Sequence, residues 1–103
     1  MTRHELKLSS VFYDAVAIGF KTFEIRKDDR GFRPGDILIL KEVNYKDDGI
    51  AVYTGRNCEA VVAYILRHED FPAGIPEGYV VMSIHVAIVN NEGGSTPSME
   101  GFL

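Results

Sequence analysis

One stretch of the sequence decides the fold: Glu59-Ala60-Val61-Val62-Ala63-Tyr64-Ile65-Leu66. Successive side chains of a strand point to opposite faces of a sheet, and in this stretch both faces are apolar. A strand with two apolar faces is typical of the middle of a sheet, where both sides are covered. Residues 59–66 are therefore predicted to be a central strand, and the remaining strands are expected on either side of it.

Turn signals separate this strand from its neighbours. Residues 37–43 are apolar and β-branched enough for a buried strand, and the stretch from Tyr79 to Val89 reads as the last strand. The polar residues 44–49 predict a hairpin loop, and Thr54-Gly55-Arg56-Asn57 predicts a further turn. Residues 68–78 contain two prolines and two glycines and predict a longer loop.

The start of the chain predicts a strand, a helix and a second strand. Residues 4–8 alternate, with the less polar side chains on one face, which indicates a short strand. Two serines then offer caps for the first turn of a helix, and Gly19 stands where a left-handed stop is expected. We expect a helix from Ser10 to Ile18, followed by an alternating strand over residues 21–26.

These elements predict a mostly β (α+β) fold: a small β-barrel of five to six strands with one short helix after the first strand. Closure into a barrel would remove exposed strand edges. Residues 1–90 are expected to form this single domain. Residues 91–103 are rich in glycine and small polar side chains, and we expect them to be a flexible C-terminal tail.

Composition limits the kind of protein this is. The chain has 103 residues, 46% of them apolar, and a net charge of -4, which disfavours a protein that binds nucleic acid by general phosphate attraction. Cys58 is a lone cysteine, which fits a reducing compartment. No signal peptide or membrane span is visible, so we expect a cytoplasmic protein. The histidines lack metal-ligand spacing, and we expect a monomer without a metal or cofactor.

The most informative charges lie in Gly19-Phe20-Lys21-Thr22-Phe23-Glu24-Ile25-Arg26. Glu24 and Arg26 are two positions apart on a strand and so share a face, and Lys21 stands at the junction between helix and strand. Two interpretations follow from the residues. Such charges are most often an ion pair on a solvated face, which contributes about 0–1 kcal/mol to stability. The alternative is a cleft in which the three side chains converge on a ligand.

A family resemblance favours the cleft. Gly19, Lys21, Glu24 and Arg26 match the G-x-K-x-x-E-x-R signature, by which the chain resembles the ASCH domains of the PUA-like superfamily. Further similarity to a small ASCH-type family of bacteria and phages runs in order over residues 4–89: His4-Glu5-Leu6-Lys7, Arg26-Lys27-Asp28-Asp29-Arg30, Gly35-Asp36-Ile37-Leu38 and Tyr53-Thr54-Gly55-Arg56. The resemblance implies a small β-barrel that binds RNA or a modified nucleoside in a cleft beside the signature.

The resemblance implies a set of binding residues. Lys21, Glu24 and Arg26 would line the cleft. We add three residues as ligand-binding candidates: Lys27, which follows the signature, Arg56, which could reach a phosphate from its turn, and His4, which could approach the cleft from the first strand. The aromatic side chains that could stack on a base are Phe20, Phe32 and Tyr53.

Two other functions remain open. Some ASCH-type relatives are amidohydrolases that remove an acyl group from acylated cytidine with a lysine and, three residues on, a threonine. Lys21 matches the lysine, but Glu24 stands at the threonine position, so hydrolysis is expected to be absent or weak. If the chain is an enzyme, Lys21 and Glu24 would be its catalytic residues, with Glu24 as the acid and base in hydrolysis by water. The third possibility is an interaction domain of a phage or mobile element.

Overall fold

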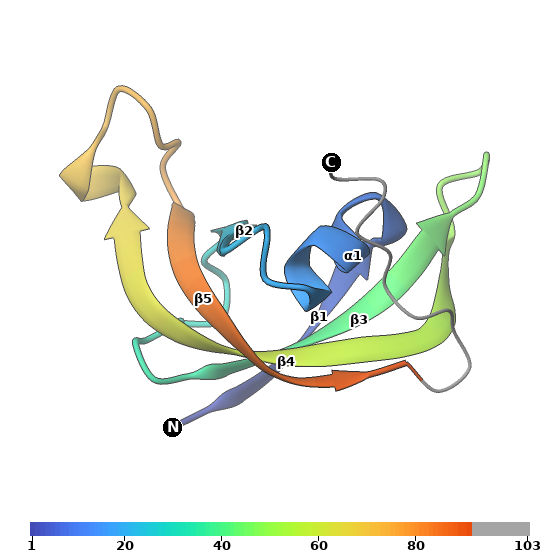
Figure 1. The fold of residues 1–103 in the computed structure, drawn as a ribbon. Coiled ribbons are helices and arrows are strands. Elements are labelled where there is room, and N and C mark those ends of the chain that lie inside the picture. The colour runs from blue at the N-terminus through green and yellow to red at the C-terminus, as the bar shows by residue number, and fades with distance from the viewer. Residues whose placement is uncertain (92–103) are drawn as a thin grey trace.

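One α-helix and one five-stranded sheet make up the part of the chain that the structure describes, residues 1–91 of a computed structural model (Figure 1). The elements in chain order are β1 (Arg3–Ser9), α1 (Ser10–Ala17), β2 (Phe23–Lys27), β3 (Ile37–Tyr45), β4 (Ala51–Arg67), a short 3₁₀ turn (His68–Asp70) and β5 (Tyr79–Asn90). The mostly β fold with one short helix after the first strand is thus confirmed. The predicted flexible tail lies outside the described residues, apart from Asn91.

The sheet has the strand order β1-β3-β4-β5-β2 and curls into a half-barrel (Figure 1). β1 pairs with β3 in parallel, and every other neighbouring pair is antiparallel. β1 and β2 are the two edge strands, so no hydrogen-bonded ladder joins them within the described residues. The predicted barrel is therefore left open along the line where β1 and β2 face each other, which we call the seam.

β4 is one long strand, although residues 54–57 were predicted to form a turn. Lys41 pairs with Asn57 and Val43 pairs with Tyr53, so three residues of β4 lie opposite Glu42 alone. This bulge contains Gly55, whose φ of 97° is one that other residues rarely adopt. The turn prediction was wrong because a glycine with positive φ also serves to bend a strand without reversing the chain.

The helix follows from its capping residues. The Ser9 hydroxyl accepts a hydrogen bond from the N–H of Val11 at 3.3 Å, which satisfies one of the free donors of the first turn. Gly19, with a φ of 82°, follows the C-cap Ile18 and ends the helix. The predicted helix is confirmed, and its C-terminal end is one residue shorter than expected.

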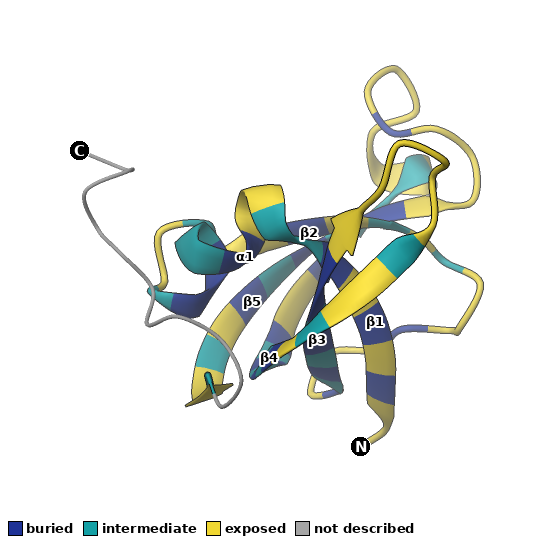
Figure 2. Ribbon diagram, turned by 90° about the vertical axis from the view of Figure 1, so that its right-hand side faces the viewer, coloured by how far each residue is buried: buried dark blue, intermediate teal, exposed yellow. Residues whose placement is uncertain are grey.

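The core lies between α1 and the concave face of the sheet. Buried and exposed residues alternate along β1, as the predicted alternation requires (Figure 2). Tyr13 and Val16 of α1 are completely buried against the sheet. The largest fully buried side chains of the sheet and its loops are Phe32, Leu38, Leu40, Val43, Val62, Val80, Met82 and Ile84. The helix in the described residues is too short to cross a lipid bilayer.

A buried pair of polar side chains ties β1 to the turn before β3. His4 Nε2 lies 2.8 Å from Asp36 Oδ2, and the carboxylate also accepts from the N–H groups of Thr2 and Arg33, each at 3.0 Å. Burial by itself raises the pKa of Asp36, but the hydrogen bonds from His4, Thr2 and Arg33 together lower it to about 2. The ionised carboxylate is therefore part of the folded structure.

We expect Asp36→Asn to lower the free energy of unfolding at pH 7 by about 1–3 kcal/mol, because it leaves buried donors without their acceptor. The pKa of Asp36 is lower in the folded than in the unfolded chain, so its contribution to stability is present above about pH 4. That contribution is lost as the pH falls toward the folded-state pKa. The difference between wild type and variant should narrow from pH 5 to pH 2 in urea titrations; a constant difference would contradict this role.

Candidate functional site

The signature segment begins where α1 ends. The N–H of Lys21 donates to the carbonyl of Ala15 at 2.9 Å, which fixes the junction against the last turn of the helix. β2 starts two residues later, and its alternation turns Glu24 toward the core while the residues on either side point outward. Glu24 lies opposite the buried Met82 of β5. A carboxylate in this position needs cationic partners, because an unpaired buried charge is strongly destabilising.

Lys21, Glu24 and Arg26 lie together. Glu24 is 3% exposed; its Oε1 accepts from Lys21 Nζ and its Oε2 accepts from Arg26 Nε, both at 2.8 Å. Lys21 Nζ also donates to the carbonyl of Phe23 at 2.8 Å and lies 5.4 and 4.7 Å from the ring centres of Phe12 and Phe23. The arrangement differs from an exposed ion pair on a strand, because the carboxylate is buried and only its two cations reach solvent.

Arginine side chains bridge the seam. Arg26 Nη2 donates to the carbonyl of Lys7, and Arg30 Nη1 donates to the carbonyl of Glu5, both at 2.7 Å. In a parallel ladder, the main-chain groups of every second residue face the partner strand. The N–H of Ile37 donates a hydrogen bond to the carbonyl of Thr2, so even-numbered residues of this segment face β3. The main-chain groups of Glu5 and Lys7 therefore face away from β3, into the seam.

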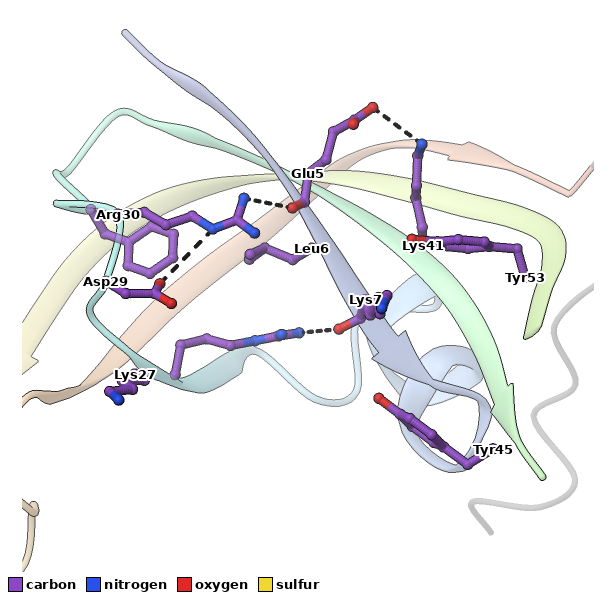
Figure 3. Close-up of a pocket in the computed structure, with 11 residues that line it drawn as sticks. Glu5, Leu6, Lys7, Lys27, Asp29, Arg30, Lys41, Tyr45 and Tyr53 are labelled. Carbon is purple, nitrogen blue, oxygen red and sulfur yellow. Dashed lines mark hydrogen bonds and ion pairs between the residues drawn. The ribbon is translucent and has the colours of Figure 1, made fainter. Parts of the chain in front are cut away.

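A groove with many cations runs along the seam on the β1 side; we call it the basic groove (Figure 3). Its volume is about 490 Å³, and it is lined by Glu5, Leu6, Lys7, Arg26, Lys27, Asp29, Arg30, Phe32, Lys41, Tyr45 and Tyr53. Arg30 lies on one side of β1, and Lys41 and Tyr53 lie on the other (Figure 3). Among residues 1–91, five cations and two carboxylates line this groove, in a chain whose net charge is -4.

A second groove, the apolar groove, adjoins the first at the helical end of the seam. Its volume is about 440 Å³, and it is lined by Lys7, Leu8, Ser9, Phe12, Lys21, Phe23, Glu24, Ile25 and Arg26. Phe12, Phe23 and Ile25 remain largely exposed, which is unusual for large apolar side chains gathered in one place. Lys7 and Arg26 line both grooves, so the two meet where Arg26 crosses the seam.

Three further candidates from the sequence take different positions. Lys27 lines the basic groove. His4 does not line either groove; it is buried against Asp36 and packs edge-on to the ring of Phe32 at 4.8 Å. Arg56 is also absent from both linings. The structure therefore brings Lys21, Glu24, Arg26 and Lys27 to the seam and directs His4 and Arg56 into buried polar contacts.

The contacts of Arg56 show why it lies elsewhere. Its Nε and Nη2 bind both carboxylate oxygens of Glu42, at 2.7 and 2.6 Å, and its Nη1 lies 3.0 Å from Asp14 of α1. Its guanidinium is 4.6 Å from the ring centre of Tyr13. The hydrogen bond from Arg56 is the main reason that the pKa of Glu42 is lowered. The bulge at Gly55 turns Arg56 inward to hold the helix on the sheet.

Several lining residues were not among the sequence candidates. Tyr53 was named as a stacking residue, but Tyr45, Lys41 and Lys7 were not, because their proximity depends on the parallel pairing of β1 with β3. Arg30 appeared in the sequence only as the last residue of the run Arg26-Lys27-Asp28-Asp29-Arg30 and was not proposed as a binding residue. Its one visible signal was its place four residues after Arg26, and that signal does not reveal the contact with Glu5 across the seam.

Neither a reactive cysteine nor a metal site is indicated among the described residues. Burial, and to a smaller extent the nearby Glu24 carboxylate, raise the pKa of Cys58 to about 12, so this buried side chain is a neutral thiol at neutral pH. Within residues 1–91, no three histidine, cysteine or carboxylate side chains are grouped as they would be to hold a metal ion. The groups available at the seam are cations, the shielded carboxylate of Glu24, the more exposed carboxylates of Glu5 and Asp29, aromatic rings and main-chain amides.

We expect Glu24→Gln to lower the free energy of unfolding by about 2–4 kcal/mol, because it removes the buried charge that balances Lys21 and Arg26. Glu59→Gln is the matched control, since Glu59 pairs with the half-exposed Arg3 and should change stability by about 0.5 kcal/mol or less. Urea denaturation measures both. Equal losses in the two variants would mean that the Glu24 pairs are no stronger than a surface ion pair.

Comparison with known proteins identifies relatives of the chain. It is 38% identical over 68 residues to the "Uncharacterized 12.9 kDa protein in GpA 3'region" of Escherichia phage P2. The matched region is 66% of this chain and 58% of the phage protein, so the chain spans less than two thirds of that relative. The model of the family described as "Domain of unknown function (DUF3850)" matches residues 3–84, which run from the start of β1 into β5. The chain therefore belongs to the DUF3850 family.

Proposed function

We propose that this chain is an ASCH-type domain of the PUA-like superfamily that binds single-stranded RNA or a nucleobase-containing ligand at the seam. One observation carries the proposal: the three charged residues of the G-x-K-x-x-E-x-R signature meet beside an open groove that concentrates cations in an acidic chain. A signature that only stabilised the sheet would not need an accessible groove of ligand size.

The charge distribution supports a nucleic-acid ligand with a local binding site. The net charge of -4 opposes long-range attraction of phosphates, so affinity has to come from directed contacts at short range. Lys27 and Arg30 are exposed on one side of the basic groove, and Lys41 is partly exposed on the other. Cationic side chains on both walls suit a phosphate backbone that follows the groove.

The aromatic residues support recognition of single strands. Tyr45 and Tyr53 line the basic groove with more than half of their surface exposed, and Lys41 Nζ lies 5.8 Å from the ring centre of Tyr53. Unpaired bases stack on exposed aromatic rings of this kind, whereas bases in a duplex are already stacked on each other. The ligand is accordingly single-stranded.

We also propose that binding occurs without hydrolysis. Lys21 and Glu24 are in contact and could in principle act as acid and base, which is the feature that favours an amidohydrolase. Both oxygens of Glu24 are already engaged by cations, and the hydroxyl-bearing residue of the amidohydrolase relatives is replaced by Glu24 itself. We place this monomeric binding domain in the reducing cytoplasm of a bacterium or a phage-infected cell, in keeping with its lone cysteine.

Two substitutions test the binding site. Tyr53→Ala should weaken binding of a short single-stranded RNA oligomer about 5- to 150-fold, because a stacked base contributes about 1–3 kcal/mol. Lys27→Ala should weaken binding of all RNA sequences to a similar extent. It should also reduce the slope of the logarithm of the binding constant against the logarithm of the salt concentration by roughly one. Fluorescence titrations at several salt concentrations measure both effects.

The chain offers a matched control for each variant. Tyr64 is an exposed tyrosine of β4 outside both groove linings, and Lys46 is an exposed lysine of the β3–β4 loop that is also outside them. Tyr64→Ala and Lys46→Ala should leave binding unchanged. If the seam variants bind as tightly as these controls, the seam is not the binding site.

The hydrolase alternative has a direct test. We expect wild-type protein incubated with an acylated cytidine to release no free acid and no cytidine, because the seam lacks an activated nucleophile. Mass spectrometry of the mixture over time measures both products. Release that disappears in Lys21→Ala, while that variant still unfolds cooperatively, would show that the domain is a hydrolase.

A further inference from the structure

Asp29 is an exposed carboxylate in the lining of the basic groove. Its side chain is 67% exposed, and its one ion pair within residues 1–91 is with Arg30, whose Nε lies 3.9 Å from Asp29 Oδ1. This separation is longer than a hydrogen bond, so the oxygens of Asp29 are accessible acceptors. A carboxylate repels phosphate, and its place among the cations of this groove therefore points to a ligand group other than phosphate.

The residues on either side of Asp29 hold it at the groove. Asp28 Oδ2 accepts a hydrogen bond from Arg67 Nη1 of β4 at 2.9 Å, and Arg30 Nη1 donates to the carbonyl of Glu5 on β1 at 2.7 Å (Figure 3). Asp29 thus lies between two residues that are bound to different strands. An acceptor held in this way loses little conformational freedom when a ligand binds to it.

Arg30 places hydrogen-bond donors beside this acceptor. A guanidinium has five N–H groups, and the carbonyl of Glu5 takes one of those of Arg30. The Arg30 side chain is 44% exposed and lines the same groove, so its other donors can bind a phosphate. The second carboxylate of the lining, that of Glu5, is already balanced by Lys41 Nζ at 3.2 Å. Asp29 and Arg30 therefore form one pair of neighbouring acceptor and donors.

A ribonucleotide chain carries the complementary pair. The 2′-hydroxyl of a ribose is attached to the carbon next to the one whose oxygen carries the following phosphate, so a hydrogen-bond donor and an anion lie side by side. A carboxylate can accept from this hydroxyl but cannot donate to any group of the ligand. DNA presents the same phosphate without the hydroxyl, and this hydroxyl is the group by which proteins distinguish the two nucleic acids.

We propose that Asp29 accepts a hydrogen bond from a ribose 2′-hydroxyl while Arg30 binds the adjacent phosphate, so that the basic groove selects RNA over DNA. The inference rests on the proposed function and deepens it, because it names the sugar of the ligand and the residue that determines this specificity. Against DNA the Asp29 carboxylate only repels the phosphates, whereas against RNA the hydrogen bond offsets that repulsion.

Three single-stranded oligouridylates of equal length test the role of the hydroxyl: RNA, its 2′-deoxy analogue and its 2′-fluoro analogue. Fluorine keeps the sugar in a conformation close to that of RNA but cannot donate, so it separates the hydrogen bond from the shape of the sugar. In fluorescence titrations RNA should bind about tenfold more tightly than either analogue, because a hydrogen bond to a charged acceptor is gained. RNA that binds no more tightly than the 2′-fluoro analogue would overturn the proposal.

Asp29→Ala removes the acceptor and should leave the fold intact, because an exposed ion pair contributes little to stability. In this variant the tenfold preference for RNA over the 2′-fluoro analogue should disappear. Asp47→Ala is the matched control, since Asp47 is an exposed carboxylate of the β3–β4 loop outside the lining of the basic groove, and it should keep the preference. A preference that survives in Asp29→Ala, or that is lost equally in both variants, would contradict the role of Asp29.

The same titrations separate this inference from the function on which it rests. If all three oligomers bind with equal affinity, the hydrogen bond to Asp29 is absent and the binding of single strands at the seam stands. If none of the three oligomers binds, both the inference and the proposed function fail.

Discussion

The rest of the structure depends on one feature: the five-stranded sheet does not close into a barrel, and side chains connect its two edges. β1 and β2 are the edges of a five-stranded half-barrel, and side chains rather than a main-chain ladder connect them. Arg26 is the central connection, because one guanidinium binds the buried Glu24 carboxylate and the carbonyl of Lys7 at the same time. A closed ladder would have placed strand backbone where the grooves now lie. The accessible surface at the seam is thus a direct consequence of replacing main-chain pairing with long cationic side chains.

Two of the three buried carboxylates in the described part of the chain are balanced by arginine side chains. Glu24 is balanced by Lys21 and Arg26 at the seam, and Glu42 is balanced by Arg56 on the side of the sheet where the bulge lies. In both cases the partner arginine also makes a second contact, to a main-chain carbonyl or to Asp14 of the helix. Each pair therefore joins elements that are distant in sequence. The difference lies in exposure: the cations at Glu24 reach solvent, whereas Arg56 is buried.

Local patterns in the sequence predicted much of the fold and part of the site. Alternation identified β1 and β2, and the serine cap and Gly19 delimited α1 closely. The spacing of two residues between Glu24 and Arg26 predicted that both lie on one face of the strand, and in the structure the two side chains are in contact. The bulge at Gly55 was predicted to be a turn, because a glycine with positive φ occurs in turns and in bulges alike. The two can be told apart only from the pairing with β3.

The rest of the site could not be predicted from local patterns. Parallel pairing of β1 with β3 brings together residues more than thirty positions apart, such as Lys7 and Lys41, and no short-range signal encodes it. The inward turn of Arg56 depends on Glu42 and Asp14, which lie on two other elements. From the sequence, Arg56 could be recognised only as a cation next to a glycine. Its buried position depends on tertiary contacts that no local pattern encodes.

The cations of the seam also affect how one molecule meets another. Exposed edge strands often cause aggregation, because their unpaired carbonyl and N–H groups can form hydrogen bonds with a strand of another molecule. Here Arg30 and Arg26 cover the carbonyls of Glu5 and Lys7 on one edge, and Lys21 covers that of Phe23 on the other. A strand from a neighbouring molecule would have to displace two charge-assisted hydrogen bonds before it could add to the β1 edge, and one before it could add to the β2 edge. The half-barrel can thus keep the seam accessible to solvent and still resist aggregation through its strand edges.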